Sequence, residues 1–167
     1  MTFADKTWEE RISDPMFYHS ERIFEKMWPG PLQHFGLGLA SNRMAVWKMP
    51  AFMLHTPDYI GGYTEESTPV LIEVQGTGTK AEVRTHKFKH KKLEALGKWN
   101  SIHEVTFWLW DDKTETYVWT SYASIRLMVA QGKATEGSFD GKRPYWAIPV
   151  DVVTECADTD RLLEKYG

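Results

Sequence analysis

The segment from Pro69 to Gly76 constrains the fold of this chain most, because it places a carboxylate inside an apolar run. Glu73 lies in the middle of Val70–Val74, whose composition is typical of a strand that is buried on at least one face. A charge in such a strand is costly unless another group compensates it. Alternation along the strand puts Gln75 on the same face as Glu73. A polar site is therefore expected on one face of this strand.

The sequence before this strand predicts its hairpin partner. Leu54–Gly62 and Pro69–Gly76 flank the polar stretch Thr64–Thr68, which is typical of a turn. Pairing centred on that turn sets Asp58 directly opposite Glu73, with Cβ atoms roughly 5 Å apart. Like charges so placed repel each other, and a divalent cation is the partner that makes the arrangement favourable. Two plainer interpretations stay open, a turn aspartate after proline for Asp58 and a solvent-facing strand residue for Glu73.

Composition limits the class of protein. The chain has 167 residues, which predicts a single domain over residues 1–167, with eight Trp, eight Phe and seven Tyr to fill its core. No apolar run is long enough to span a membrane, so no membrane association is expected. One cysteine, Cys156, and an N-terminus without signal-peptide features favour the cytoplasm, or a host cytoplasm for a phage-encoded protein. The net charge of −3 means that any nucleic-acid binding must come from a local patch.

Periodicity and turn formers predict the order of the elements. Helices are expected at about Lys6–Trp28 (interrupted near Pro15), Lys87–Asn100, Ser124–Gly132 and Asp158–Gly167. A loop is expected at Trp28–Arg43, a strand within Ala45–Leu54, an extended link at Gly76–Thr85, an aromatic hairpin at Val105–Tyr122 and an edge strand in Arg143–Val153. This order predicts an α/β fold with a mixed sheet flanked by helices.

Together these features resemble the PD-(D/E)XK nuclease superfamily. Its metal site uses Pro-Asp on one strand and (Asp/Glu)-X-Lys on the next, and here Pro57-Asp58 precedes Glu73-Val74-Gln75. The resemblance implies a restriction-endonuclease-like αβββαβ core, similar to that of Holliday-junction resolvases and RecB-like enzymes. That core would span residues 15–125, and residues 126–167 would add a C-terminal hairpin and helix.

The sequence departs from the pattern where the family has its lysine. Gln75 can hydrogen-bond a water molecule but supplies no positive charge. Some members take the lysine from the following helix, and here Lys92 lies at the centre of the apolar stripe formed by Phe88, Ala95, Leu96 and Trp99. Lys92 is therefore the first candidate to replace the missing lysine, and Lys89, at the edge of the stripe, is the second. In the alternative interpretation Lys92 only extends along core side chains to water.

Two further groups of residues extend the candidate site. Glu21 shares a helical stripe with Phe17, Phe24 and Trp28, and the resemblance implies an acidic residue from the first helix at the metal site. An ion pair at the edge of the core is the competing explanation for Glu21. The segment 80–92 is basic and predicts a track for DNA phosphates, with Lys80, Arg84, Lys87, Lys89 and Lys91 as candidate contacts.

The resemblance implies a metal-dependent DNA endonuclease or exonuclease that hydrolyses phosphodiester bonds. The expected ligands of Mg²⁺ (or Mn²⁺) are Asp58, Glu73, Glu21 and the backbone carbonyl of Val74. Gln75 and Lys92 or Lys89 would assist catalysis. Small members, often phage-borne, act on junctions, flaps or single strands in recombination, repair or replication. A junction resolvase would form a homodimer, with the hairpin Val105–Tyr122 as a candidate interface. The alternatives are a catalytically inactive nuclease-fold module that binds DNA or protein, and an unrelated α/β interaction protein.

Overall fold

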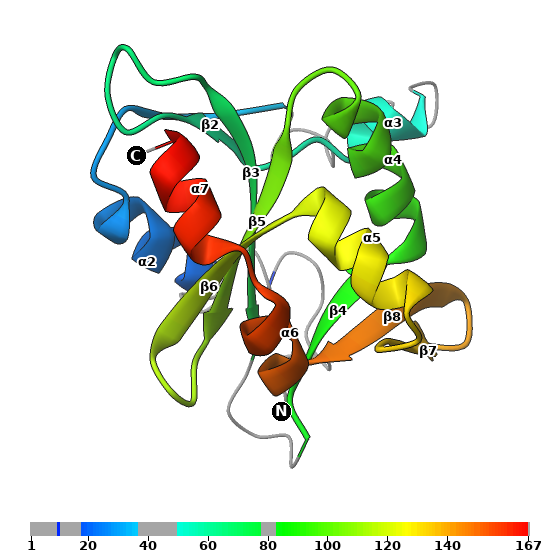
Figure 1. Cartoon of the computed structure of the whole chain (residues 1–167). Helices are drawn as coiled ribbons and strands as arrows, with labels where there is room; N and C mark the ends of the chain where they lie inside the picture. Colours follow the sequence, from blue (N-terminus) through cyan, green and yellow to red (C-terminus); the bar gives the residue numbers. More distant parts are fainter. Residues whose placement is uncertain (1–9, 11–17, 37–49, 78–82, 167) are drawn as a thin grey trace.

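Two β-sheets and six helices make up the regular structure in the described part of the chain (Figure 1). The computed structural model describes residue 10 and residues 18–36, 50–77 and 83–166. The helices are α2 (His19–Met27), α3 (Ala51–Leu54), α4 (His90–Asn100), α5 (Tyr122–Ala130), α6 (Val150–Cys156) and α7 (Thr159–Tyr166). The strands are β1 (Leu32–His34), β2 (Tyr59–Gly61), β3 (Val70–Thr77), β4 (Thr85–Lys89), β5 (Val105–Asp111), β6 (Thr116–Ser121), β7 (Thr135–Phe139) and β8 (Arg143–Pro149).

The main sheet has the strand order β1-β2-β3-β5-β6. Strands β1, β2 and β3 are antiparallel neighbours, and β5 then pairs with β3 in parallel. The connection between these two parallel strands passes through α4, as parallel pairing requires a long crossover. From α2 to β5 the chain forms a helix, three antiparallel strands, a helix and a strand, with α3 inserted between β1 and β2 and β4 inserted between β3 and α4. The predicted αβββαβ mixed-sheet core is confirmed.

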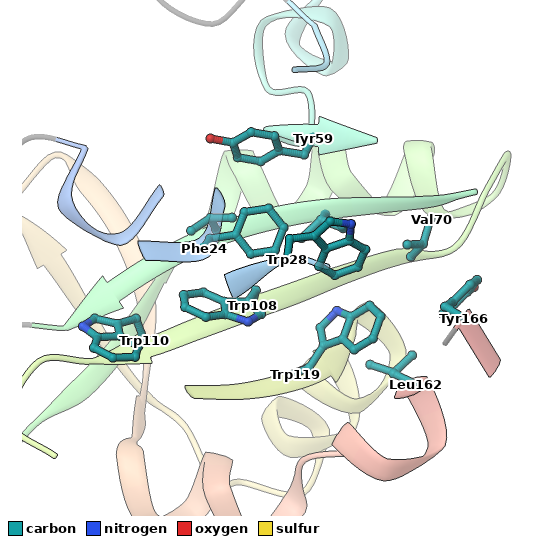
Figure 2. Close-up of a cluster of buried hydrophobic side chains, with 11 residues drawn as sticks. Phe24, Trp28, Tyr59, Val70, Trp108, Trp110, Trp119, Leu162 and Tyr166 are labelled. Atoms are coloured by element: carbon teal, nitrogen blue, oxygen red, sulfur yellow. The ribbon is translucent and has the colours of Figure 1, made fainter. Parts of the chain in front are cut away.

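Helices cover both faces of the main sheet. Figure 1 shows α2 and α7 on one side and α4 and α5 on the other. On the first side, Phe24 from α2 and Trp28, the residue after this helix, pack in one cluster with Trp119 from the sheet and Leu162 from α7 (Figure 2). The second cluster combines Leu71, Leu93, Leu96, Phe107 and Ile125. Side chains alternate between the two faces of β3, so Ile72 packs in the first cluster and Leu71 packs in the second.

A second, three-stranded sheet with the order β4-β8-β7 lies beside α4 (Figure 1). Two predictions are corrected here. Residues Thr85–Lys89, expected as an extended link and the first turn of a helix, form strand β4, and the helix begins at His90. Arg143–Pro149, expected at a sheet edge, is the central strand, and Pro149 ends it at the start of α6. The predicted C-terminal hairpin is confirmed as β7–β8, but it pairs with β4 from the core.

Three smaller predictions also differ from the structure. Leu32–His34, expected within a loop, adds a short strand to the main sheet. Ala51–Leu54, expected to be extended, forms helix α3, while residues 45–49 lie outside the described part. Of the long first helix, His19–Met27 is observed, and residues 11–17 are not described. Short segments depend on tertiary packing more than on local preference, which explains these differences.

The aromatic hairpin is confirmed as β5 and β6, but it faces the interior of the protein. Trp108 is 3% exposed and Trp119 is 1% exposed, so these rings belong to the core (Figure 2). The outer edge of β6 is covered as well, because Thr159 Oγ1 accepts from the Trp119 amide at 3.0 Å and Asp158 Oδ1 from the Ser121 amide at 2.8 Å. These side chains occupy donors that edge-to-edge strand pairing would need. The described residues therefore do not support this hairpin as a dimer interface.

None of the helices in residues 18–36, 50–77 and 83–166 is long and apolar enough to cross a membrane.

Candidate active site

The β2–β3 hairpin brings two carboxylates together. Tyr59 pairs with Ile72 and Gly61 with Val70, so continuing the register by one residue sets Asp58 opposite Glu73, as predicted. Asp58 Oδ2 accepts a hydrogen bond from the backbone amide of Val74 at 2.8 Å, which holds this carboxylate against β3. The carbonyl of Asp58 accepts from the Phe35 amide at 2.8 Å. Both the side chain and the backbone of Asp58 are therefore fixed by neighbouring strands.

Glu73 is a buried carboxylate with one oxygen occupied and one unused. Its side chain is 5% exposed, and Oε1 forms an ion pair with Nζ of Lys92. Oε2 is buried and has no hydrogen-bond partner among the residues that the structure describes. Burial, followed by the negative charge of Asp58, raises the pKa of Glu73 well above its usual range, although Lys92 opposes this. An unpaired buried carboxylate oxygen is costly, so this position suits a cationic ligand.

Lys92 supplies the positive charge of the site from helix α4. It lies in the first turn of that helix, where Leu93 and Leu96 anchor the helix against the sheet. Burial alone would lower the pKa of Lys92, but attraction to Glu73 and then Asp58 outweighs it and raises the pKa above the usual value. The structure therefore shows the predicted inward orientation of Lys92, with its ammonium group on Glu73. Its catalytic role remains a prediction.

Glu21 extends the acidic cluster from helix α2. It is half-buried and shares the lining of a pocket of about 670 Å³ with Asp58 and Lys92. Burial raises the pKa of Glu21 to about 7, and the negative charge of Asp58 adds to this effect. The structure thus brings the predicted acidic residue of the first helix to the same pocket as Asp58. Its role as a metal ligand is not tested by this placement.

A second pocket, of about 620 Å³, lies on the other side of Lys92. It is lined by Glu73, Val74, Gln75, Lys89 and Lys92, among others. Gln75 is half-buried and shares the face of β3 that carries Glu73. Burial, followed by the charges of Lys92 and Arg143, lowers the pKa of Lys89. Lys92 lines both pockets, so the predicted catalytic residues lie in the walls of two pockets that share this lysine.

The predicted DNA contacts separate into different environments. Lys87 and Lys89 line the second pocket, and Lys91 is exposed on α4. The side chain of Arg84 is only 16% exposed and forms an ion pair with Asp111, so its charge already has a structural partner. Lys80 lies outside the described residues. The lysines on β4 and α4 are therefore the cations that remain available to a phosphate chain.

Two residues at the pockets were not singled out in the sequence. His55 lines the first pocket, and burial together with the charge of Lys92 lowers its pKa. Phe139 from β7 lines the second pocket. Phe139 is far from Glu73 in the chain and becomes its neighbour only through the second sheet. No local pattern in the sequence signals either residue as part of a site.

The carboxylates fit a divalent cation in their chemistry, although their arrangement is not that of a closed metal site. Among the described residues, no group of three or more His, Cys, Asp and Glu side chains is clustered closely enough to hold a metal ion. The unused Oε2 of Glu73 and the neighbouring Asp58 nevertheless provide the oxygen donors that Mg²⁺ prefers. Lys92 now occupies the other oxygen of Glu73.

Comparisons with solved structures support the fold. The Holliday junction resolvase Hjc from Archaeoglobus fulgidus aligns with a TM-score of 0.51 and 10% identity, covering 89% of this chain and 96% of that one. D212, a nuclease from a fusselovirus, aligns with a TM-score of 0.50 and 15% identity, covering 95% of this chain and 97% of that one. One of these proteins is thus a Holliday junction resolvase and the other a nuclease. The predicted resemblance is confirmed at the level of the fold.

At these identities the comparison concerns the fold alone. No protein-family model matches the sequence, and a comparison with curated protein sequences finds no match.

Proposed function

We propose that this protein is a metal-dependent nuclease that hydrolyses phosphodiester bonds in DNA. The observation that carries the proposal is the buried Glu73, which pairs with Lys92 and lies opposite Asp58 in the hairpin register. Two acidic groups and one ammonium group thus meet on the fold of PD-(D/E)XK nucleases. A buried cluster of this kind is costly for folding, and perturbed carboxylates in a pocket are typical of functional sites.

The acidic residues would hold Mg²⁺ or Mn²⁺. Asp58 and Glu73 are the proposed ligands, assisted by Glu21 and by the backbone carbonyl of Val74. When bound, the cation would lower the pKa of a water molecule and offset charge on the phosphate. The hydrogen bond from the Val74 amide already fixes the orientation of Asp58. The high pKa values of Glu73 and Glu21 reflect carboxylates that would be more stable beside a cation.

The polar residues on the opposite side would handle the attacking water and the phosphate. Gln75, beside Glu73 on the strand face, would orient the water by hydrogen bonding. Lys92 would stabilise negative charge as it develops on the phosphate, with its charge maintained by Glu73. Lys89 is the second candidate for this role because it lines the same pocket. Helix α4 thus supplies the ammonium group that the strand lacks at Gln75.

The proposed substrate is DNA with a structural feature such as a junction, a flap or a single strand. One structural neighbour is a Holliday junction resolvase, which makes branched DNA a reasonable first test. Lys87, Lys89 and Lys91 would contact phosphates, since they are exposed on β4 and α4. A homodimer would be expected for a four-way junction. A place in recombination, repair or replication would follow from the substrate.

One observation favours a second function. Gln75 stands where the nuclease pattern has a lysine, so a nuclease-fold module that binds DNA or protein without catalysis is the alternative. In that case Lys92 would only compensate the charge of Glu73. The ion pair between them is compatible with both functions.

A cleavage panel separates the two functions. Wild-type protein is incubated with Mg²⁺ or Mn²⁺ and single-stranded, duplex, flapped and four-way DNA, in parallel with Glu73→Gln. We expect cleavage of at least one substrate, abolished by chelation and reduced at least about 100-fold in the variant. Glu94→Gln, an exposed glutamate of α4, is the matched control and should keep full activity. If the wild type and Glu73→Gln showed the same trace activity, the proposal that this protein is an enzyme would be rejected.

A further inference from the structure

The outer face of the second sheet carries a pair of partly exposed aromatic rings. The ring centroids of Phe139 and Tyr145 lie 4.5 Å apart, with an interplanar angle of 51°. Gly137 pairs with Tyr145 across β7 and β8, and a Cβ atom on Gly137 would lie 2.7 Å from the Tyr145 ring. The glycine therefore lets the tyrosine ring lie close against the β7 backbone. Both rings are half-buried, so each retains contact with solvent.

Three cationic side chains surround these two rings. Lys87 Nζ lies 5.4 Å from the Phe139 centroid and 5.0 Å from that of Tyr145. Lys89 Nζ lies 5.9 Å from the Phe139 centroid, and Arg143 Cζ lies 5.8 Å from it. Such distances are within the range of cation–π attraction. The rings and cations together form a cluster, Lys87, Lys89, Phe139, Arg143 and Tyr145, which we call the aromatic platform.

Acidic groups near the aromatic platform are already paired. Asp140 Oδ2 lies 2.8 Å from Arg143 Nη2, so it neutralises one of the three cations. Glu136 alternates to the opposite face of β7, where its carboxylate lies 3.6 Å from His90 Nε2. Lys87 and Lys89 have no ion-pair partner among the described residues. Two positive charges therefore remain to attract an anion beside the rings.

The aromatic platform borders the candidate active site. Phe139, Lys87 and Lys89 line the same pocket of about 620 Å³ as Glu73 and Lys92. A phosphate near Lys92 and a nucleobase on Phe139 would therefore belong to neighbouring positions of one bound strand. Bases in an intact duplex are stacked on one another and cannot place a face on a protein ring. Stacking platforms with nearby cations are instead a feature of proteins that bind single strands.

We propose that the aromatic platform stacks an unpaired nucleobase next to the phosphate at the candidate active site. The ligand is a single-stranded segment of nucleic acid, with Phe139 and Tyr145 contacting the base and Lys87 and Lys89 its phosphates. The placement of this base next to a phosphate at the candidate active site rests on the proposed nuclease function. The proposal narrows the substrate of that nuclease to DNA with unpaired nucleotides. Base stacking of this kind tolerates every sequence, because each base has a π-face.

Binding without catalysis tests the proposal independently of cleavage. The probes are a fluorescently labelled 12-nucleotide single strand, an abasic strand with the same number of phosphates and a blunt duplex, each titrated in EDTA. Fluorescence anisotropy should show that the wild type prefers the single strand to both other probes. Phe139→Leu keeps an apolar side chain but removes the π-face, so single-strand affinity should fall roughly tenfold. Affinity for the abasic strand should stay unchanged, and Phe139→Trp should retain the preference.

The matched control is Phe52→Leu on α3. Phe52 is half-buried and lies 5.6 Å from Lys98 Nζ, but it lines neither pocket, so its replacement should not alter binding. Equal wild-type affinity for normal and abasic strands would overturn the proposal. Equal losses for both strands in Phe139→Leu would also overturn it, because they would indicate a purely structural or electrostatic role. If the protein never cleaves DNA but shows the Phe139-dependent preference, the proposed nuclease function is refuted and the proposed stacking on the aromatic platform is supported.

Discussion

At the level of single residues, the candidate site is recognisable by a buried charged group whose burial is costly for folding. Glu73 could be identified from sequence because a carboxylate inside an apolar strand needs a partner, and the structure supplies Lys92. Helical periodicity was sufficient to orient Lys92 and Glu21, since each lies on an apolar stripe. Local periodicity could not predict the ion-pair partner of Arg84, because this partner, the buried Asp111, belongs to a distant strand. Residue patterns thus predict orientation well and partners poorly.

Stability without metal should depend on the pH through Glu21. Its pKa is about 7 in the folded protein and 4.5 ordinarily, so folding disfavours loss of the proton. The stability that this group contributes is present below pH 4.5 and is lost as the pH rises to about 7. In metal-free buffer Glu21→Gln should therefore match the wild type at pH 4.5. At pH 8 it should exceed the wild type by on the order of 1 kcal/mol, allowing for partial exposure.

Urea denaturation at the two pH values measures this difference, with the exposed residue Glu94 replaced by glutamine as the control. A stability difference between Glu21→Gln and wild type that is the same at both pH values would contradict the raised pKa.

At the scale of elements, sequence patterns were informative where one face is apolar and the other polar. The β2–β3 register followed from the turn between the strands, and the β5–β6 hairpin from its alternating aromatic residues. Strand β4 was missed because its two lysines gave it the composition of a solvated segment. Strand β8 was placed at an edge because of Pro149, which in fact marks the end of the strand. Pairing between distant strands left no local signal in either case.

The two sheets are joined by an ion pair whose loss should be costly. Arg84 precedes β4 and Asp111 ends β5, and their side chains are 16% and 6% exposed. Thr114 Oγ1 also donates to Asp111 at 2.7 Å. Asp111→Ala would leave the guanidinium of Arg84 without its partner and should lower the free energy of unfolding by about 3 kcal/mol. Chemical denaturation measures this loss.

The matched control is the exposed pair of Arg143 and Asp140, whose side chains are 61% and 59% exposed. Asp140→Asn should lower the free energy of unfolding by less than about 1 kcal/mol, because water already solvates both groups and asparagine also tolerates the φ of 52° at this position. Similar losses in Asp111→Ala and Asp140→Asn would argue against a structural link between the sheets at Arg84.

At the scale of the whole molecule, the candidate site lies where the two sheets approach each other. Asp58 and Lys92 line one pocket, and Glu73 and Lys92 line the other, to which the second sheet adds Lys87, Lys89 and Phe139. The αβββαβ core could be predicted from the order of the elements. The contribution of the second sheet could not, because β4 pairs with a strand more than 50 residues later in the chain. Because of that pairing, the pocket beside the hairpin is lined by both acidic and basic residues.

The rate of cleavage by Lys92→Gln shows whether α4 supplies the ammonium group of a catalytic site. The rate of cleavage of the best substrate is measured under single-turnover conditions, and Mg²⁺ binding is measured by calorimetry on the same preparation. We predict a loss of at least about 100-fold in rate with metal binding retained, because Asp58 and Glu73 remain in place. Full activity in Lys92→Gln would contradict the account.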